Sequence, residues 1–405
     1  MRVLINASAH FVLTGDGTLW TPLPAMSSAV WTRYLDVFDE VRLLARAHQR
    51  ATPPDGWRPA TGEGITATPL PDYVGAWGLL GSFGRMSRAI RAAVPRAEAI
   101  LFRLPCHIAV QASRHLPRTR PYAVELIGDP YDVFAPGTLK HPLRPFLRWW
   151  FPRQTRALCA GAAVAGYVTK HALQRRYPPG PNAFSLDVSD VDLPEAAFSG
   201  APRPHPRGPR VNLVFVGTLT QLYKAPDVLI DAVGLCVGAG LDLGLVLVGD
   251  GKHRPDLEAR AARLGLAERV SFRGQLTTAE QVRRELDAAD LFVMPSLTEG
   301  LPKAMLEAMA RGLPCIGSAV GGIPELLPAE DLVAPRDAAA LAAKIREVIV
   351  TPDRMAQMSA RNLREARAYS DHLLRARRIS FLEQLREETS RWLKARNGAS
   401  SLERS

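Results

Sequence analysis

Short apolar runs alternate with longer amphipathic stretches along most of the chain. In the second half the apolar runs are VNLVFVG (211–217), LGLVLVG (243–249), RVSFRG (269–274), ADLFVMPS (289–296) and LPCIGSAVGG (313–322). Apolar runs of this length are typical of parallel strands that are buried on both faces. Helical patterns such as 225–240 and 254–265 lie between them. The alternation predicts a doubly wound α/β domain.

The first half repeats this pattern less regularly. Its strand candidates are MRVLINA (1–7), EVRLLAR (40–46), AEAILFRLP (97–105), YAVELIGD (122–129) and AAVAGYVT (162–169). Between the halves, SGAPRPHPRGPR (199–210) is rich in Pro, Gly and Arg and has no periodicity, which indicates a linker. We therefore expect an amino-terminal domain over 1–200 and a carboxy-terminal domain over 201–370.

The end of the chain has a different composition. From about Ser370 a charged helical pattern begins, and we expect a helix over 371–395 that packs back on the amino-terminal domain. The polar stretch 396–405 predicts a disordered tail. In open α/β sheets, ligands lie beyond the carboxyl ends of the strands, so the loops after the strands are where a functional site is expected.

Composition and charge narrow the class of protein. The chain has 405 residues, 47% of them hydrophobic, which is typical of a globular protein. A net charge of +11 favours a polyanionic partner or an anionic membrane. However, the excess is mainly Arg spread along the chain, which favours a basic background. No nucleic-acid-binding motif accompanies the charge, so we expect no nucleic acid partner.

One segment adds a second interpretation of the charge. RPFLRWWFPRQTRALC (144–159) mixes Arg with Trp and Phe, so it is either a helix with internal aromatics or a peripheral membrane contact. No apolar run of eighteen residues occurs, and the start, MRVLINASAHFVL, interrupts any signal-like run with Asn6, Ser8 and His10. The four separated cysteines show no C-x-x-C spacing. These features predict a cytoplasmic protein, with contact at the inner face of the membrane left open.

The segment SLTEGLPKAMLEAMARG (296–312) carries two glutamates, Glu299 and Glu307. Glu299 falls in a strand-to-helix loop, and the backbone N–H groups of Gly300, Leu301 and Lys303 are expected to face the crevice beyond the sheet. These N–H groups and the helix dipole favour an anionic phosphate there. Glu307 has a simpler alternative, because Lys303 and Arg311 at i−4 and i+4 predict a solvated salt-bridge stripe.

This segment, together with VGGIPELL (320–327), resembles the donor-site signature of retaining nucleotide-sugar glycosyltransferases of glycosyltransferase family four. The resemblance implies the GT-B fold, in which two Rossmann-like doubly wound domains face each other across an interdomain cleft. It implies that Glu299 contacts the hydroxyls of the donor sugar near the reacting centre. It also implies that Glu307 accepts hydrogen bonds from the nucleotide ribose.

Three further segments of the second half resemble this family. In FVGTLTQLYKAPDVLIDA (215–232), Lys224 matches a lysine that binds the donor diphosphate, beside Gly217. Thr218 stands where relatives usually carry an arginine. LVLVGDGKHRPDLE (245–258) matches a glycine turn beneath the donor, at Gly249, and VSFRGQL (270–276) resembles the base-reading segment around Arg273 and Gly274.

The first half carries weaker signals. A Gly-rich loop after the first strand often covers the donor phosphates, and Gly15 and Gly17 are the candidates here. Relatives place a histidine close to the sugar, for which His107 is the candidate, with Arg103, Glu125 and Asp129 as other polar groups nearby. The tripeptide DVD at 190–192 matches a metal-binding Asp-x-Asp of another glycosyltransferase fold, but its surroundings lack that fold's pattern.

Taken together, the motifs predict a glycosyltransferase of the retaining, hexosyltransferase type. It would move a sugar from a nucleotide diphosphate sugar to an acceptor hydroxyl, with Glu299, Lys224 and His107 as the catalytic candidates. The resemblance implies no cofactor and no metal beyond the donor itself. Two alternatives stay open at this point: a non-catalytic nucleotide-sugar-binding relative, and a GT-B sugar-nucleotide epimerase or phosphorylase.

Overall fold

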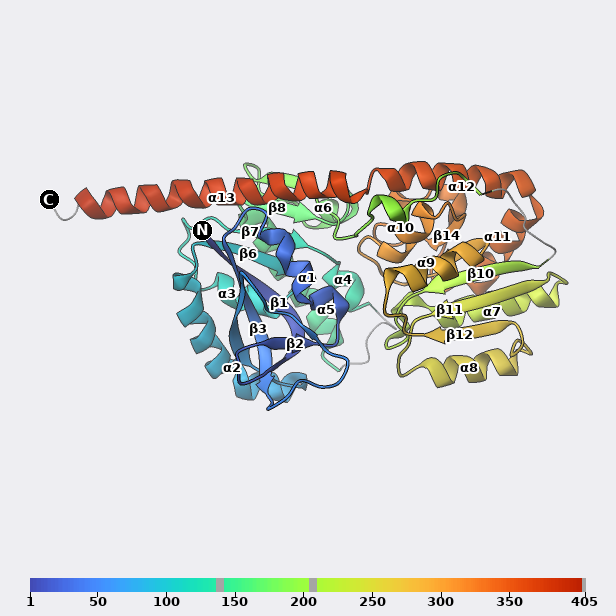
Figure 1. The fold of residues 1–405 in the computed structure, drawn as a ribbon, viewed down its shortest axis with the longest axis horizontal. Helices are drawn as coiled ribbons and strands as arrows, with labels where there is room; N and C mark the ends of the chain where they lie inside the picture. Colours follow the sequence, from blue (N-terminus) through green and yellow to red (C-terminus); the bar gives the residue numbers. More distant parts are fainter. Residues whose placement is uncertain (136–141, 204–209, 403–405) are drawn as a thin grey trace.

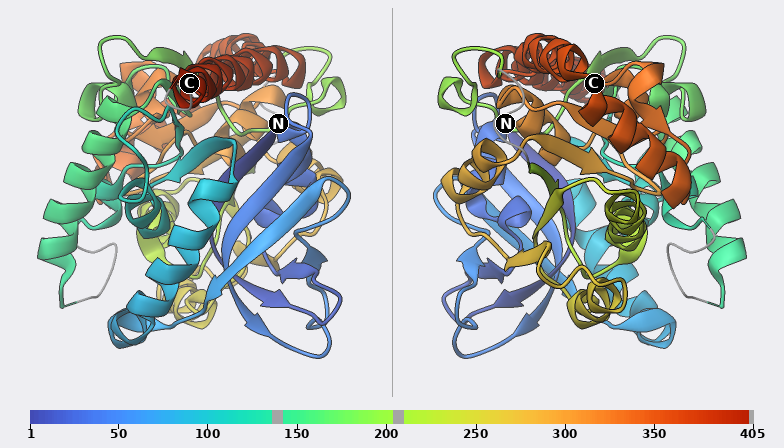
Figure 2. Two further views of the ribbon diagram at one scale, coloured as in Figure 1. Left: turned by 90° about the vertical axis from the view of Figure 1, so that its left-hand side faces the viewer. Right: turned by 90° about the vertical axis from the view of Figure 1, so that its right-hand side faces the viewer.

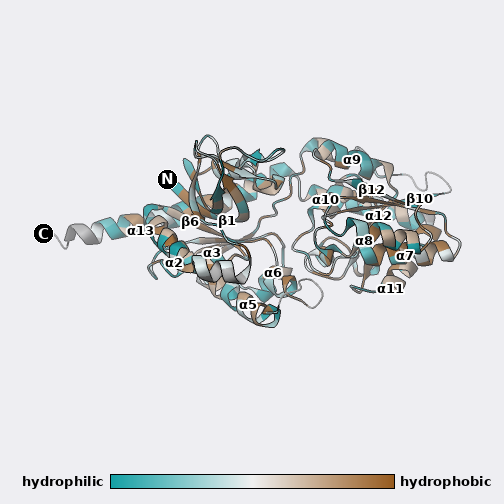
Figure 3. Ribbon diagram, turned by 90° about the horizontal axis from the view of Figure 1, so that it is seen from below, coloured by the Kyte–Doolittle hydropathy of each residue, from teal (hydrophilic) through white to brown (hydrophobic). Residues whose placement is uncertain are grey.

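The computed structural model describes residues 1–135, 142–203 and 210–402. This part of the chain forms two lobes, each built around its own mainly or wholly parallel sheet (Figure 1). Seen from below, the lobes lie one after the other along the long axis of the molecule (Figure 3). No helix in the described ranges combines the length and apolar composition that crossing a membrane requires.

The first lobe holds a nine-stranded sheet with the order β4-β2-β1-β6-β7-β8-β9, and β3 pairs with both β1 and β5. Its strands are β1 (Arg2–Leu13), β2 (Leu19–Thr21), β3 (Glu40–Gln49), β4 (Arg58–Pro59), β5 (Ile65–Pro71), β6 (Ala99–Leu104), β7 (Ala123–Leu126), β8 (Val164–Tyr167) and β9 (Phe184–Asp187). All pairs are parallel except those that β2 makes with β1 and β4.

Helices cover both faces of this first sheet. The longer helices of one face are α2 (Gly75–Ala93), α3 (His107–Ser113) and α5 (Arg144–Gly161). The other face packs on α1 (Ser28–Trp31) and on the carboxy-terminal helix α13 (Asp371–Leu402). Two short helices, α4 (Pro130–Val133) and α6 (Ala172–Arg176), follow β7 and β8 at the carboxyl edge of the sheet.

The second lobe holds a six-stranded parallel sheet with the order β12-β11-β10-β13-β14-β15. Its strands are β10 (Val211–Val216), β11 (Leu243–Val248), β12 (Val270–Gly274), β13 (Leu291–Met294), β14 (Cys315–Ser318) and β15 (Leu332–Val333). The helices are α7 (Pro226–Gly238), α8 (Arg254–Arg263), α9 (Ala279–Ala288), α10 (Lys303–Ala310), α11 (Ala338–Val350) and α12 (Pro352–Arg367). Figure 2 shows these helices on either side of the sheet. The order is that of a doubly wound sheet whose direction of winding reverses between β10 and β13.

Helix α13 begins beside the second lobe and runs along the first (Figures 1 and 2). Its Phe381 is fully buried, and a Cβ built on Gly166 of β8 would lie 3.0 Å from the Phe381 ring. The helix continues through Leu402, where a disordered tail was expected from residue 396. No proline interrupts it, and Gly398 costs a helix only about 1 kcal/mol relative to Ala.

One hydrophobic core crosses from lobe to lobe. It joins Tyr167 and Val168 of the first lobe to Leu301 and Ile323 of the second. Backbone also approaches backbone here, because a Cβ on Gly300 would lie 2.6 Å from the carbonyl oxygen of Ile127. The lobes are therefore packed directly against each other on this side of the molecule.

Candidate functional site

The reversal of winding between β10 and β13 brings two loops together. The helices that follow adjacent strands on either side of such a point cover opposite faces of the sheet, which leaves a crevice at the carboxyl ends. The loop after β10 leads through a 3-10 turn (Leu222–Lys224) to α7, and the loop after β13 leads to α10. The two loops are tied together, since the backbone N–H of Leu297 donates to the carbonyl of Tyr223 at 2.6 Å.

Lys224 and Glu299 meet in this crevice. The Lys224 Nζ donates to Glu299 Oε1 at 2.8 Å, and the Ser296 hydroxyl donates to the same oxygen at 2.7 Å. Both charged side chains are largely buried, with exposed fractions of 14% for Lys224 and 8% for Glu299. Burial by itself lowers the pKa of Lys224, but the neighbouring Glu299 carboxylate and Tyr223 more than offset this, so the pKa lies above its ordinary value. The ammonium is therefore charged throughout the physiological pH range.

Gly217, at the end of β10, makes room for the lysine side chain. A Cβ built on Gly217 would lie 2.4 Å from Lys224 Cδ and 2.9 Å from the Phe215 ring. A side chain at position 217 would have to push Lys224 away from Glu299. The predicted site residues Gly217 and Lys224 thus depend on each other sterically, although seven positions separate them in sequence.

A cavity of ≈ 490 Å³ opens beside this pair, between the two lobes. Its wall in the second lobe includes Glu299, Gly300, Leu301 and Lys303. The remaining lining residues are Ile127, Gly128, Asp129, Val133 and Asp190 of the first lobe and Gln221, Tyr223 and Thr298 of the second. A cavity of this size is in the range of small-molecule sites, and its polar groups come from both lobes.

Helix α10 begins at the cavity without a side-chain cap. Its N-cap residue is Pro302, whose side chain cannot accept a hydrogen bond from the first turn. The helix therefore offers its first N–H groups and the positive end of its dipole to a ligand. Lys303, the first residue of α10, adds a cation that pairs with Asp190 at 2.9 Å across the cavity.

Asp190 is the residue of the first lobe that pairs with Lys303 in the wall of the cavity. Besides Lys303, the Arg103 guanidinium lies 3.9 Å from its carboxylate. Burial raises the pKa of Asp190, but Lys303 and Arg103 outweigh this effect, and the pKa lies below its ordinary value. In the tripeptide DVD, Asp190 is thus an ion-pair partner of two cations.

The salt-bridge stripe considered for Glu307 does not form. Lys303 turns to Asp190, and Arg311 makes a bidentate contact with Asp287 at 2.7 and 3.0 Å. Within the described ranges the Glu307 carboxylate has no ion pair. Its burial raises the pKa from the ordinary 4.5 to about 7, which Lys303 and Arg283 only partly counteract. This carboxyl group therefore has no hydrogen-bond or ion-pair partner among the residues that the structure describes.

The glycines of the second lobe lie where backbone segments touch. A Cβ on Gly249 would lie 1.9 Å from the Gly217 carbonyl oxygen, and one on Gly321 would lie 2.0 Å from that of Glu299. Gly274, at the end of β12, accepts a hydrogen bond from the Gly249 N–H at 2.9 Å. These contacts hold together the loops that carry Lys224 and Glu299.

Seven of the predicted second-lobe residues are not among those that line the cavity, namely Gly217, Thr218, Lys224, Gly249, Arg273, Gly274 and Glu307. Arg273 turns its side chain toward Glu285 of α9, 3.2 Å away, and is half exposed. Gly249 contacts the backbone of Gly217, and its N–H donates to the carbonyl of Gly274. Thr218 accepts a hydrogen bond from the Thr220 N–H at 3.1 Å within its own loop.

The predicted site residues of the first lobe do not line the cavity, whereas Glu299 does. His107 Nε2 lies 2.6 Å from the hydroxyl of Tyr73, and burial followed by the nearby Arg46 lowers the His107 pKa to about 4. His107 is neutral at physiological pH and is not among the residues that line the cavity. Gly15 and Gly17 form the turn between β1 and β2, and space is open around both.

Glu325 connects the lobes in a way that the sequence did not reveal. Its carboxylate accepts hydrogen bonds from the backbone N–H groups of Lys170, His171 and Ala172, at 2.6, 2.9 and 2.6 Å. These N–H groups lie at the amino-terminal end of helix α6 in the first lobe. Glu325, which we expected to be structural or hydrogen-bonded at a helix start, therefore caps a helix of the opposite lobe.

Asp129 and Asp190 were not among the proposed site residues, although Asp129 was named as a polar group near the expected sugar position. Asp129 lies three residues after the end of β7, and its place near a strand end was the signal for it. Asp190 follows β9, a short and partly exposed strand without an apolar run, so the sequence pattern does not place it at the sheet edge. The residues of the second lobe were easier to identify because they follow long apolar strands.

Known glycosyltransferases resemble this chain in sequence. Residues 210–350 match the family model described as glycosyl transferases group 1, a range that includes both Lys224 and Glu299. Protein CapJ of Staphylococcus aureus is 24% identical over 327 residues, which cover 80% of this chain and 81% of that protein. The 2-deoxystreptamine glucosyltransferase of Streptomyces kanamyceticus is 29% identical over 257 residues, 57% of this chain and 64% of that protein.

Solved structures show the fold of the whole chain. Sucrose-phosphate synthase from Thermosynechococcus elongatus superimposes with a TM-score of 0.69 at 17% identity, covering 95% of this chain and 98% of that one. HepE of Anabaena, in a complex with UDP-glucose, gives a TM-score of 0.64 at 16% identity, with 96% and 99% coverage. The predicted fold class, two Rossmann-like domains in the GT-B arrangement, is confirmed.

Proposed function

We propose that this chain is a glycosyltransferase that moves a sugar from a nucleotide diphosphate sugar to an acceptor hydroxyl, with retention at the anomeric carbon. The observation that carries the proposal is the buried Lys224–Glu299 pair at the reversal point of the second sheet. It lies inside the segment that matches the glycosyl transferases group 1 model. Support for the donor class comes from HepE, whose structure contains UDP-glucose.

The donor diphosphate would lie between Lys224 and the amino-terminal end of α10. Both are positive, and both lie in a crevice from which water is partly excluded, where electrostatic stabilisation of a leaving phosphate is strongest. Because Glu299 holds the ammonium at 2.8 Å, the diphosphate would draw Lys224 from Glu299. Glu299 would then be free to accept hydrogen bonds from the hydroxyls of the donor sugar.

Transfer with retention needs no protein nucleophile in this proposal. The bond between the anomeric carbon and the phosphate oxygen breaks, and the acceptor oxygen bonds to the same face of that carbon. The acceptor proton passes to the departing phosphate. Packing of the lobes would exclude water and limit hydrolysis.

The remaining proposed contacts follow from position. Glu307, whose carboxylate has no ion pair or hydrogen bond in the described part of the chain, would accept hydrogen bonds from the ribose. Gly300, Leu301 and Lys303 line the cavity and would face the phosphates and the sugar. The backbone around Arg273 and Gly274 would contact the base. The loop of Gly15 and Gly17 would cover the donor from the first lobe.

A thermal-shift screen of nucleoside diphosphates tests the proposed donor site. We expect one of UDP, GDP and ADP to raise the melting temperature of the wild-type protein, and we expect the Lys224→Ala variant to lose that shift. Because the proposal includes no metal, the shift should survive treatment with EDTA. No shift with any nucleotide would contradict the proposal. Binding without turnover of the matching sugar nucleotide would favour the non-catalytic alternative.

A further inference from the structure

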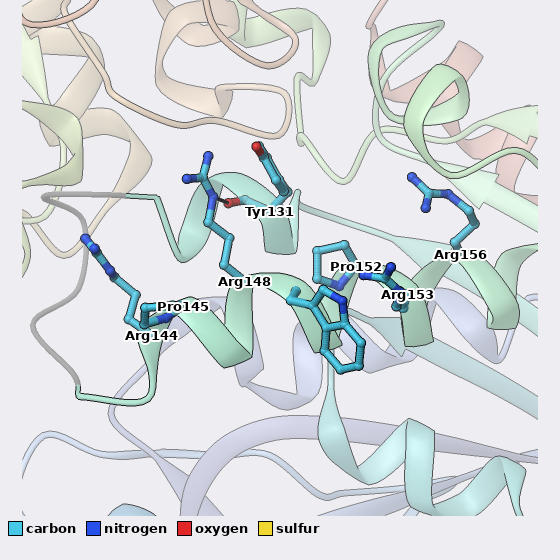
Figure 4. Close-up of a pocket in the computed structure, with 8 residues that line it drawn as sticks. Tyr131, Arg144, Pro145, Arg148, Pro152, Arg153 and Arg156 are labelled. Carbon is cyan, nitrogen blue, oxygen red and sulfur yellow. Dashed lines mark hydrogen bonds between the residues drawn. The ribbon is translucent and has the colours of Figure 1, made fainter.

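Helix α5 presents an unusual surface next to the short helix α4. It carries four arginines, Arg144, Arg148, Arg153 and Arg156, and no acidic residue. Phe146 and Trp149 on the same helix are each 52% exposed. Figure 4 shows the side chains of Arg144, Arg148, Arg153 and Arg156 spread along α5, with Tyr131 of α4 beside Arg148. We call this set of seven residues the α5 surface.

Two arginines of the α5 surface stack on aromatic rings of the same surface. Arg148 Cζ lies 4.0 Å from the ring centroid of Tyr131, and Arg153 Cζ lies 4.4 Å from that of Trp149. Arg148 Nε also donates to the Tyr131 carbonyl at 3.3 Å. Together they border an open groove of ≈ 440 Å³. Stacking holds the guanidinium groups in place but leaves their charge in full.

The carboxylates near this surface form their ion pairs with another cation in the described ranges. Asp129, the N-cap residue of α4, and Asp132 within α4 both contact Arg176 of the neighbouring helix α6. In the described ranges no ion pair involves an arginine of α5. The surface therefore combines four arginines that form no ion pair in the described ranges with exposed aromatic rings, although Arg148 is close enough to counteract in part the burial that raises the pKa of Asp132.

This combination is not explained by packing inside the lobe. The other side of α5 already supplies the core contacts, through Thr155, Leu158 and Cys159. Half-exposed Trp and Phe among arginines suit the boundary between lipid headgroups and acyl chains, where the rings enter and the guanidinium groups remain with the phosphates. Anionic lipids would supply the complementary charge.

We infer that the α5 surface docks on an anionic lipid bilayer, with Phe146 and Trp149 inserted at the headgroup level. Helix α4 links this surface to the cavity, because its Tyr131 borders the groove while Val133 lines the cavity. Docking would thus place the opening of the cavity close to the lipid. If the proposed function is correct, the acceptor is an amphiphile whose hydroxyl group reaches the cavity from the membrane surface.

Vesicle cosedimentation tests the docking with the full chain and without any sugar donor. We expect the wild-type protein to sediment with vesicles of phosphatidylcholine and phosphatidylglycerol, but not with phosphatidylcholine alone. Near a membrane each arginine contributes about fivefold to binding, so Arg144→Gln combined with Arg153→Gln should weaken it by about 25-fold. Trp149→Ala should weaken it as well.

Matched variants separate docking from general effects. Arg144→Lys combined with Arg153→Lys keeps the charge and should keep the binding. Arg263→Gln, an exposed position on α8, should leave it unchanged. Circular dichroism verifies that each variant is folded. Three outcomes would overturn the inference: no sedimentation with anionic vesicles, equal sedimentation of the Gln variants, or complete release by millimolar inorganic phosphate at constant ionic strength. Because no donor is present, these results do not depend on the proposed transferase activity.

Discussion

Lys224 Nζ lies 2.8 Å from Glu299 Oε1, so two groups that we assign to different parts of a donor are partners of each other. The lysine follows β10 and the glutamate follows β13, strands that are adjacent in the sheet but separated in the chain by β11 and β12. The doubly wound topology creates this contact. It also implies that a diphosphate must compete with Glu299 for the ammonium.

Replacing either partner should abolish transfer. We expect Lys224→Ala and Glu299→Gln each to lower kcat by about 10²–10³, the typical loss when one preorganised electrostatic group is removed. Lys224→Ala also leaves the Glu299 carboxylate buried without its cation. The melting temperature of the Lys224→Ala variant should therefore fall more than that of the Glu299→Gln variant. Lys394→Ala, an exposed position on α13, is the control. Wild-type turnover in either site variant would contradict the assignment.

Gly217→Ala tests the steric link between β10 and the lysine. The added Cβ would lie 2.4 Å from Lys224 Cδ, so the side chain must move away from Glu299. We expect a loss of activity of at least about tenfold, the scale on which a mispositioned catalytic group acts. Gly238→Ala on α7 adds the same methyl group in open space and should keep full activity. Equal activity in the two variants would show that the position of the lysine stem is unimportant.

Glu307 should make stability depend on pH. Its pKa is raised by burial from 4.5 to about 7 in the folded chain, so the folded state binds the proton more tightly than the unfolded state. Between these two values the folded state loses stability as the pH rises, and above pH 7 the loss is complete. Glu307→Gln should therefore raise the melting temperature at pH 8 and leave it nearly unchanged at pH 4.

Two measurements accompany this prediction. Glu268→Gln, at an exposed position, should show no such pH dependence. The same Glu307→Gln protein should bind the nucleoside diphosphate more weakly, because the amide is a poorer acceptor for ribose hydroxyls. A stabilised variant with unchanged nucleotide affinity would remove Glu307 from the proposed donor contacts.

Glu325→Gln tests the contact between the lobes. The carboxylate accepts three N–H groups of α6, and an amide oxygen is a weaker and less versatile acceptor. We expect a larger radius of gyration in solution scattering and a lower kcat, with the nucleotide affinity of the second lobe retained. Glu330→Gln, at a nearby exposed carboxylate, is the control. An unchanged radius together with an unchanged kcat would show that this cap does not hold the lobes.

The second lobe could be predicted from sequence almost element by element. Its central strands β10, β11, β13 and β14 are largely buried, so apolar runs mark them, and Glu299, Glu307 and Lys224 follow such runs in the sequence. The same signal failed where strands are short or exposed: β9 and β15 were not predicted, and neither was the position of Asp190. The β2–β4 extension was also missed, because β4 contains only Arg58 and Pro59.

Contacts between segments that are far apart in the sequence could not be predicted either. Helical spacing predicted that Lys303 and Arg311 would form ion pairs with Glu307. In the structure Lys303 pairs with Asp190 instead, and Arg311 pairs with Asp287. Pairing rules along a helix describe an isolated helix, whereas α10 is packed between the lobes. The cap that Glu325 provides for α6 is likewise a product of how the lobes pack, which no local pattern encodes.

The role of the Lys224–Glu299 pair can be measured as release of nucleoside diphosphate from a panel of UDP-, GDP- and ADP-sugars. We expect slow release from one donor by the wild-type protein without any acceptor, and no release above background by the Lys224→Ala and Glu299→Gln variants. Absence of release from every donor, or equal release by wild type and both variants, would contradict the claim that the Lys224–Glu299 pair is the centre of a sugar-transfer site.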